Sequence, residues 1–274
     1  MQKSDEVDIL VIGGGPAGST AASMAAKSGL SVKVCERSKF PREHVGESLL
    51  PASIAILEEL GLKEAISNAG FLPKYGATMV WGQDETPWSW RFSETNKQNI
   101  HSYQVSRPIF DEILLKRSAE LGVLVEEESS ATKILTDDPN RGAVVTNKIG
   151  QEYFQPAKFI VDASGQSALL ARNLNLRQWD ENFQNLAVYG YFAGAKKLPA
   201  PDENNIFIES YENGWVWSIP LNDDITSVGA VVDSNETNAE LRKTDPVTFL
   251  KDQLSLTNRT SDMLSEAELK SDAK

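Results

Sequence analysis

The chain has 274 residues, of which 41% are hydrophobic and 24% are charged, and these proportions fit a globular protein of one large or two modest domains. Its formal net charge of −12 argues against nucleic acid and anionic lipid as partners, because both are negatively charged themselves. One cysteine, Cys35, and two histidines, His44 and His101, exclude an internal disulfide and leave too few ligands for an ordinary zinc site.

Neither a targeting sequence nor a membrane span is expected. The N-terminal run MQKSDEVDIL is too acidic for a secretory signal. The apolar stretch 9–30 is interrupted by five glycines and by Lys27, which a membrane helix would not tolerate. Together with the single cysteine, these features predict a protein of the reducing cytoplasm.

A glycine-rich turn between a strand and a helix dominates the first forty residues. The run VDILVI predicts a buried strand, the segment STAASMAAKSGL a helix, and LSVKVCER a second strand. Strand, turn, helix and strand in about thirty residues form the βαβ unit that binds dinucleotides. The turn matches the motif GxGxxG, and its expected cofactor-binding residues are Gly13, Gly15, Pro16, Ala17 and Gly18.

Each glycine of that motif has a physical task. Gly13 permits the tight turn, Gly15 lets the backbone approach a pyrophosphate, and Gly18 lets the helix pack closely on the strand. The free N–H groups at the helix N-terminus would face the phosphates. Glu36 ends the second strand, where its carboxylate can accept hydrogen bonds from ribose hydroxyls and would repel a 2′-phosphate. These residues alone leave FAD and NAD both open.

Further helices and strands follow in chain order. Residues 106–122 carry the apolar spacing of a helix, with Arg107 at its start. The guanidinium of Arg107 could reach a phosphate there, or it could be an ordinary solvated arginine. The segment FIVDASG predicts another buried strand with Asp162 near its end, and DPVTFLKDQLSL begins a helix at its Asp-Pro pair.

From residue 186 the pattern changes to short strands joined by polar turns, which predicts an antiparallel sheet. Residues 71–82 show the same pattern, so we expect them to belong to this sheet. Within this part, NGWVWSIP (213–220) places Trp215, Trp217 and Ile219 on one strand face. Aromatic strand faces usually serve only core packing, and that interpretation stays open on composition.

Taken together, these motifs resemble the flavin-dependent halogenases, within the larger family of flavoprotein monooxygenases. GGGPAG with Glu36 is similar to the FAD fingerprint, and FPREHVGESLLPAS to the Gly-Glu-Ser segment that lies along the flavin. GFLPKYGATMVWG places Lys74 where the halogenases carry their catalytic lysine, and NGWVWSIP matches their motif WxWxIP. The resemblance is greatest to the branch acting on phenols or carrier-bound aromatics.

The resemblance implies an enzyme in which reduced FAD, oxygen and chloride or bromide give hypohalous acid, which a lysine delivers to an aromatic carbon. The reduced flavin would come from a separate reductase, since no second dinucleotide motif is visible. The residues implied as catalytic are Lys74, Trp215, Trp217, Glu47 and Ser48. Those implied as cofactor-binding, besides the glycine turn and Glu36, are Arg37, Gly46, Glu47, Ser48, Arg107 and Asp162.

Less specific interpretations of these residues remain. Lys74 could be a solvated lysine on an edge strand rather than a desolvated amine, and Glu47 could be a first-turn carboxylate favoured by a helix dipole. Related flavoenzymes that reduce isoprenoid chains or hydroxylate aromatics share the FAD segments, so both are alternatives. A non-catalytic remnant that only binds or scaffolds is a third.

The implied fold is α/β: a Rossmann-like FAD-binding domain interleaved with an antiparallel substrate-side sheet. The expected FAD-binding domain comprises 4–70 and 100–182, the sheet 71–99 and 183–244, and residues 245–274 begin an incomplete helical region. One departure from the family is that none of the 18 glycines is followed by aspartate, whereas such flavoproteins carry a later Gly-Asp segment. We therefore expect a fragment, a truncated protein or one that has lost catalysis.

Overall fold

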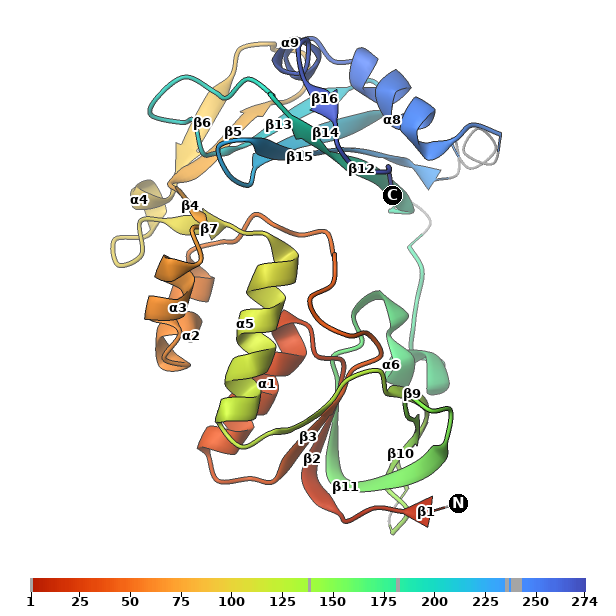
Figure 1. Ribbon diagram of the computed structural model, residues 1–274. Coiled ribbons are helices and arrows are strands. Elements are labelled where there is room, and N and C mark those ends of the chain that lie inside the picture. Colours follow the sequence, from red (N-terminus) through yellow and green to blue (C-terminus); the bar gives the residue numbers. More distant parts are fainter. Residues whose placement is uncertain (1, 138, 181–182, 235–236, 238–242) are drawn as a thin grey trace. The chain divides into compact units, whose positions relative to one another are not determined.

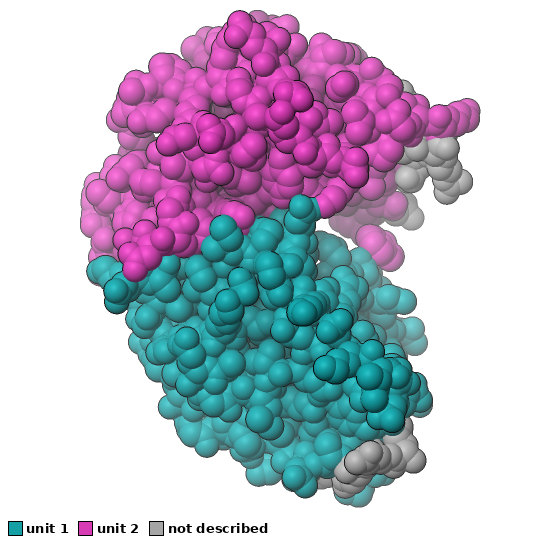
Figure 2. Space-filling model, viewed as in Figure 1, with its two compact units in different colours: residues 1–45, 57–66, 107–178 teal, residues 46–56, 67–106, 179–274 magenta. Residues whose placement is uncertain are grey.

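The computed structural model describes residues 2–137, 139–180, 183–234, 237 and 243–274 (Figure 1). The chain divides into two compact units, coloured separately in Figure 2. Unit 1 comprises Met1–Val45, Leu57–Ile66 and Arg107–Gln178, and unit 2 comprises Gly46–Ile56, Ser67–Ser106 and Trp179–Lys274. Unit 2 therefore includes 46–56, 67–70, 100–106 and 179–180, which the sequence assigns to the FAD-binding domain.

Unit 1 contains a seven-stranded sheet in the order β8-β3-β2-β11-β10-β9, with β1 paired to β11. The strands β8, β3, β2 and β11 run parallel, whereas β10 and β9 are antiparallel additions. Their bounds are β1 Gln2–Lys3, β2 Val7–Ile12, β3 Val32–Cys35, β8 Leu124–Glu126, β9 Ser130–Leu135, β10 Gly142–Thr146 and β11 Glu152–Asp162. The first two long strands lie where the hydrophobic runs predict them.

Helices cover the parallel part of this sheet. On one face, α1 (Pro16–Lys27) and α5 (Arg107–Glu120) bury Ala22 and Leu115 against Val11 and Val34. Leu10 and Ile12 point to the opposite face, which explains why VDILVI is apolar at nearly every position. The remaining helix of unit 1 is α6 (Leu169–Asn173), while α2 (Ala52–Glu59) and α3 (Lys63–Asn68) each have residues in both units. Unit 1 is thus a Rossmann-like α/β fold, as expected.

Unit 2 is built on a second seven-stranded sheet, in the order β16-β12-β15-β14-β13-β5-β6. The bounds are β5 Gly76–Val80, β6 Trp88–Arg91, β12 Asn185–Ala193, β13 Ile206–Tyr211, β14 Gly214–Pro220, β15 Ile225–Asp233 and β16 Glu268–Leu269. Every pair is antiparallel except β5 with β13. The four strands predicted from residue 186 onward pair antiparallel, as expected. The strand β5 pairs in parallel with β13, because the long stretch of chain between these two strands permits that direction.

One face of this second sheet is closed by the C-terminal segment. Helix α8 (Pro246–Ser255) begins at Asp245, whose carboxylate accepts hydrogen bonds from the N–H groups of Val247 and Thr248 at 3.0 and 3.1 Å. Its residues Phe249 and Leu250 are fully buried against the sheet. A short helix, α9 (Arg259–Met263), follows, and β16 then pairs with β12. Residues 245–274 therefore contribute side chains to the core of unit 2.

A small two-stranded sheet completes unit 2. It pairs β4 (Leu72–Lys74) with β7 (Ser102–Gln104), and the helix α4 (Phe92–Thr95) lies between them in sequence. In the described part of the chain, none of the helices combines the length and apolar character needed to cross a bilayer.

Candidate functional site

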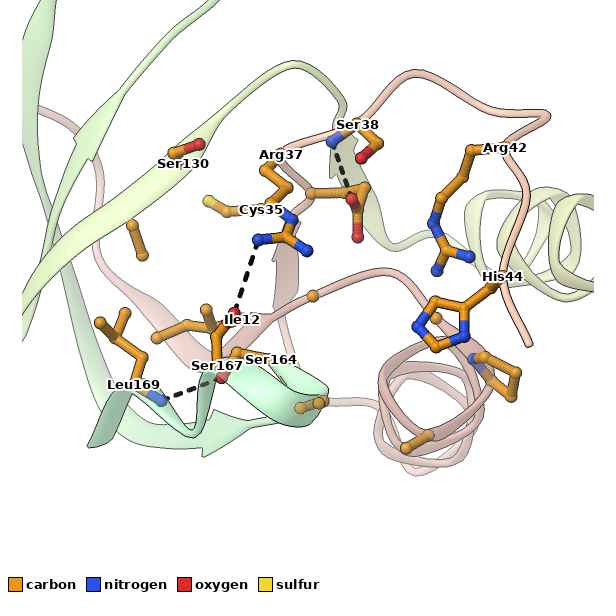
Figure 3. Close-up of a pocket in the computed structure, with 18 of the residues that line it drawn as sticks. Ile12, Cys35, Arg37, Ser38, Arg42, His44, Ser130, Ser164, Ser167 and Leu169 are labelled. Carbon is orange, nitrogen blue, oxygen red and sulfur yellow. Dashed lines mark hydrogen bonds between the residues drawn. The ribbon is translucent and has the colours of Figure 1, made fainter. Parts of the chain in front are cut away.

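Unit 1 contains a cavity of about 560 Å³ at the glycine turn (Figure 3). Ile12 and Cys35, the last residues of β2 and β3, line it together with the first turn of α1. Ligands of doubly wound sheets bind in this position, beyond the carboxyl ends of the strands. Of the predicted cofactor-binding residues, the lining includes Gly13, Gly15, Pro16, Ala17, Glu36, Arg37 and Arg107.

Two glycines of the turn, Gly13 and Gly18, occupy positions that no larger residue could take. Gly13 has φ +100°, and a Cβ there would lie 2.5 Å from the carbonyl oxygen of Ala163. A Cβ on Gly18 would lie 1.8 Å from the Gly13 oxygen, so this glycine sets the close approach of helix and strand. Gly15 is the N-cap of α1 and no side chain caps that end. The first-turn N–H groups therefore face the cavity, as a phosphate site requires.

Glu36 is 5% exposed and its carboxylate ties the turn to β3. The Gly14 N–H donates to Oε2 at 2.6 Å and the Ser38 N–H donates to Oε1 at 2.7 Å. Each carboxylate oxygen can accept a second hydrogen bond, so ribose hydroxyls could still be bound. The structure thus adds a second role to the predicted one. Glu36 holds the glycine turn in place, and its remaining lone pairs could bind ribose.

The arginine at the start of α5 is not a solvated surface residue. Arg107 is 8% exposed, donates to both carboxylate oxygens of Asp111 at 2.7 and 2.8 Å, and donates to the Val45 carbonyl at 2.5 Å. Asp111, which is fully buried, also accepts from Arg42 at 2.9 Å. Two arginines therefore share one carboxylate, which leaves net positive charge beside the cavity.

Of two other predicted residues, Arg37 lines the cavity and Asp162 does not. Arg37 is directed into the cavity, as Figure 3 shows, and its Nη1 lies 3.5 Å from Ser167 Oγ. Asp162 does not line the cavity, because its carboxylate accepts from the N–H groups of Ser164 and Leu170 at 3.0 and 2.8 Å. It holds the turn into α6 in place.

The sequence analysis missed Arg42 and His44, which line the cavity in the segment before Gly-Glu-Ser (Figure 3). A Cβ on Gly15 would lie 3.3 Å from Arg42 Nη2, so this guanidinium stands at the expected pyrophosphate position. The signal was a basic residue placed between the βαβ unit and the Gly-Glu-Ser segment. Uncapped helix N–H groups, an arginine and a ribose-facing carboxylate together fit the adenosine diphosphate part of FAD.

Unit 2 contains the predicted lysine, and it is buried. Lys74 is 2% exposed, its Nζ donates to Ser48 Oγ at 2.5 Å, and it lies 5.3 Å from the ring centroid of Phe92. Burial lowers the pKa of Lys74 from 10.5 to about 8. The interpretation as a solvated lysine on an edge strand is therefore wrong. Within unit 2, this side chain is a desolvated amine of the kind that reacts with electrophiles.

The Gly-Glu-Ser segment, with Gly46, Glu47 and Ser48, is extended beside β7 in the same unit. Leu49 N–H donates to the Tyr103 carbonyl at 3.0 Å, and Val105 N–H donates to the Glu47 carbonyl at 2.8 Å. The Glu47 side chain is fully buried and accepts from the Tyr191 hydroxyl at 3.2 Å. Since α2 begins only at Ala52, Glu47 is not a first-turn residue of that helix.

The two indoles of NGWVWSIP do share one face of β14. The ring centroids of Trp215 and Trp217 are 6.1 Å apart, and Trp217 and Ile219 are each 5% exposed. They pack in one cluster with Tyr189 and other apolar side chains of the neighbouring strands. Val216 points to the opposite face, toward α8. The strand is thus an aromatic wall on one side and helix-packed core on the other.

These features define an FAD-binding protein, and the model of the FAD binding domain family matches residues 6–270, so the chain belongs to that family. Several of its relatives are halogenases. Tryptophan 2-halogenase of Chondromyces crocatus is 37% identical over 235 residues, which cover 85% of this chain and 44% of the relative. The 1H-pyrrole-2-carbonyl-(peptidyl-carrier protein) chlorinase of Pseudomonas fluorescens is 36% identical over 261 residues, covering 86% and 58%.

A solved structure agrees with these relatives. The flavin-dependent halogenase CmlS has a TM-score of 0.92 and 36% identity, over 98% of this chain and 49% of that one. The resemblance to flavin-dependent halogenases and the choice of FAD over NAD are thereby confirmed. The chain spans about half the length of the curated relatives it matches. One relative is named for tryptophan and another for a carrier-bound pyrrole, so the branch of the family stays a prediction.

Proposed function

We propose that this chain provides the FAD-binding and lysine-bearing parts of a halogenase that places chlorine or bromine on an electron-rich aromatic carbon. The observation that carries the proposal is the state of Lys74. It is almost fully buried, its nitrogen is held by Ser48 of the Gly-Glu-Ser segment, and its proton affinity is reduced. A lysine that served solubility or surface charge would have none of these properties.

Bound reduced FAD would supply hypohalous acid from oxygen and halide. Lys74 would then receive the oxidant, either by a hydrogen bond or as an N-halo amine formed with release of water. With a pKa of about 8, roughly a tenth of the lysine is neutral at pH 7. Both forms are therefore accessible near neutrality, the ammonium to donate a hydrogen bond and the amine to attack.

The remaining predicted residues of unit 2 would shape the surroundings of the reaction. Trp215 and Trp217 would keep the aromatic substrate away from the flavin, so that only small oxidants pass. Gly46, Glu47 and Ser48 would lie along the flavin, as the resemblance implies. In unit 1, the glycine turn, Glu36 and Arg107 would hold the adenosine diphosphate part of the cofactor.

The partners follow from the same proposal. The sequence contains one dinucleotide motif, so a separate reductase would supply reduced flavin. The substrate would be a phenol or a carrier-bound aromatic, and the protein would work in the reducing cytoplasm, where its single buried cysteine is stable as a thiol.

Lys74→Met tests the proposal, because methionine keeps the apolar stem and deletes the nitrogen. FAD binding and flavin reoxidation, followed by stopped-flow, should match the wild type, while halogenated product in the mass spectrum should almost disappear. Lys63→Met, at a side chain that is 81% exposed, is the matched control. Halogenation by Lys74→Met at near wild-type rate would contradict the proposal, and a hydroxylated product formed without halide would favour an aromatic hydroxylase.

A further inference from the structure

A glycine in the middle of β15 has no role in the proposed function so far. Gly229 is buried, and β15 lies between β14 and β12 in the sheet of unit 2 (Figure 1). Glycine weakens a strand, because it loses more conformational freedom on folding than other residues and brings no side chain to pack. The φ of Gly229 lies outside the left-handed region, so the backbone itself would accept alanine. The reason for a glycine must therefore lie in the space around it.

That space is filled by two aromatic side chains. In the strand register, Gly229 is directly opposite both Trp217 of β14 and Tyr189 of β12. A Cβ on Gly229 would lie 2.5 Å from Cη2 of the Trp217 indole, closer still to its Cζ2, and 2.7 Å from Tyr189 Cβ. The six-membered ring of the indole therefore lies over the glycine itself. An added methyl group would have to push this rigid ring aside.

The nitrogen of the same indole is held by the next residue of β15 on this face. Trp217 Nε1 donates to Ser227 Oγ at 3.4 Å, and both side chains are buried. Alternate residues of a strand share a face, so Ser227 and Gly229 are neighbours beneath the indole. These two small residues form a seat that lets the indole lie across β15.

The position of this indole decides whether the aromatic side chains of unit 2 form one continuous surface. Five rings follow one another in space with neighbouring centroids 6.1 to 6.4 Å apart, in the order Trp81, Trp215, Trp217, Tyr189 and Tyr191. Such separations are those of aromatic rings in contact. Trp217 is the middle ring, so its displacement would open a gap between Trp215 and Tyr189.

We propose that Gly229 is a positioning residue: together with Ser227 it seats the Trp217 indole, which closes the row of rings that keeps the aromatic substrate away from the flavin. This inference rests on the proposed function, in which Trp215 and Trp217 separate substrate from cofactor. A side chain at position 229 would displace the indole and open the row. Gly229 thereby determines which product forms, because an aromatic that reached the flavin would be hydroxylated instead of halogenated.

Near-ultraviolet circular dichroism of the flavin-free protein tests the seat, because it reports the packing of aromatic rings. Gly229→Ala should change the spectrum of the wild type but hardly change that of Trp217→Phe, since phenylalanine lacks the two indole atoms that the new methyl group meets. Ser227→Ala adds no bulk and should show the same dependence on Trp217, so it replaces Gly229→Ala if that variant does not fold. Changes of equal size in both backgrounds, or no change from either substitution, overturn the inference.

The role in the reaction is tested on the FAD-loaded protein, with phenol as the aromatic probe and bromide as the halide. Gly190→Ala is the matched control: a Cβ on Gly190 also meets an apolar side chain, Leu269 Cδ1 at 2.6 Å, but on the opposite face of the sheet, which α8 covers. Gly229→Ala and Ser227→Ala should raise the amount of hydroxylated phenol per flavin oxidised, measured by mass spectrometry. Gly190→Ala should give the wild-type ratio.

The outcomes separate this inference from the proposed function. An unchanged ratio in Gly229→Ala and Ser227→Ala, or equal increases in Gly229→Ala and Gly190→Ala, overturns the positioning role and leaves the halogenase intact. Full halogenation by Lys74→Met overturns the proposed function alone, because neither the spectra nor the hydroxylation ratio depends on the lysine.

Discussion

The two candidate sites differ in the partners that they give to their buried cations. In unit 1, Arg107 and Arg42 share the buried carboxylate of Asp111, so each cation has a fixed partner. In unit 2, Lys74 is buried as deeply, yet no ion pair to it occurs among the described residues, and a neutral hydroxyl is its hydrogen-bond partner. The arrangement in unit 1 stabilises the charged form of the arginines, as the binding of a pyrophosphate requires. The arrangement in unit 2 disfavours the charged form of the lysine, as a reactive amine requires.

Removing the shared carboxylate should have the largest effect. Asp111→Asn keeps the shape of the side chain but removes the negative charge that two arginines share, one of them almost fully buried. Loss of one partner of a buried ion pair costs about 3–5 kcal/mol, and we expect a loss of that size in urea unfolding. Glu120→Gln, which breaks the exposed pair with Arg117, should leave the transition unchanged. Equal effects of the two substitutions would remove the contrast between the sites.

Because Lys74 is buried without an ion pair among the described residues, its lowered pKa should make the free energy of unfolding depend on pH. Its pKa is about 8 in the folded chain and 10.5 in the unfolded one, so the unfolded chain binds more protons between these values. The free energy of unfolding therefore rises with pH across this window, by about 3 kcal/mol for one full proton. Lys74→Met should lack this rise, whereas Lys63→Met should keep it.

Urea titrations at pH 7 and pH 10.5 measure this difference. Tyrosines and Cys35 also titrate at high pH, but they are present in all three proteins and cancel in the comparison. An identical pH dependence in wild type and Lys74→Met would show that the lysine is hydrated, and the chemical contrast with unit 1 would be lost.

Glu36 links the fold of unit 1 to its ligand, so its loss should act on both. Glu36→Ala leaves the N–H groups of Gly14 and Ser38 without their acceptor and removes the ribose partner. We expect FAD affinity to fall by about 1–3 kcal/mol, the scale of lost buried hydrogen bonds. Fluorescence titration with FAD gives the affinity, and urea unfolding of the flavin-free protein separates the effect on the turn. Unchanged affinity in a folded variant would contradict the ribose assignment.

How much of this was predictable differs between the sites. The glycine turn and Glu36 could be predicted, because a local sequence motif in a βαβ unit fixes the backbone that binds the cofactor. Arg42 was not, since its position depends on Asp111, 69 residues later in the chain. The parallel pairing of β5 with β13 is equally non-local.

The lysine site was foreseen only through the family resemblance. Alternation along 74–80 indicated which side chains share a face, but not that this face is buried. Lys74 is desolvated because β7 and the Gly-Glu-Ser segment pair beside it, and both arrive from other parts of the sequence. The contact of Lys74 with Ser48 has the same long-range origin, so spacing along the chain could not reveal it.

The smallest expected change in stability sharpens the comparison most, because it separates binding from folding within unit 1. A Cβ on Gly15 would meet only the flexible end of Arg42, at 3.3 Å, whereas a Cβ on Gly18 would meet the Gly13 backbone at 1.8 Å. Gly15→Ala should therefore change the free energy of unfolding by less than about 1 kcal/mol, while Gly18→Ala should prevent proper folding.

Yet Gly15→Ala places a methyl group where the backbone must approach the pyrophosphate, so FAD binding should weaken clearly in a protein of normal stability. Lys74 and its neighbours in unit 2 should be unaffected, with the Lys74 pKa still near 8. If Gly15→Ala binds FAD as the wild type does, the pyrophosphate does not lie on this turn, and the assignment of the unit 1 cavity fails.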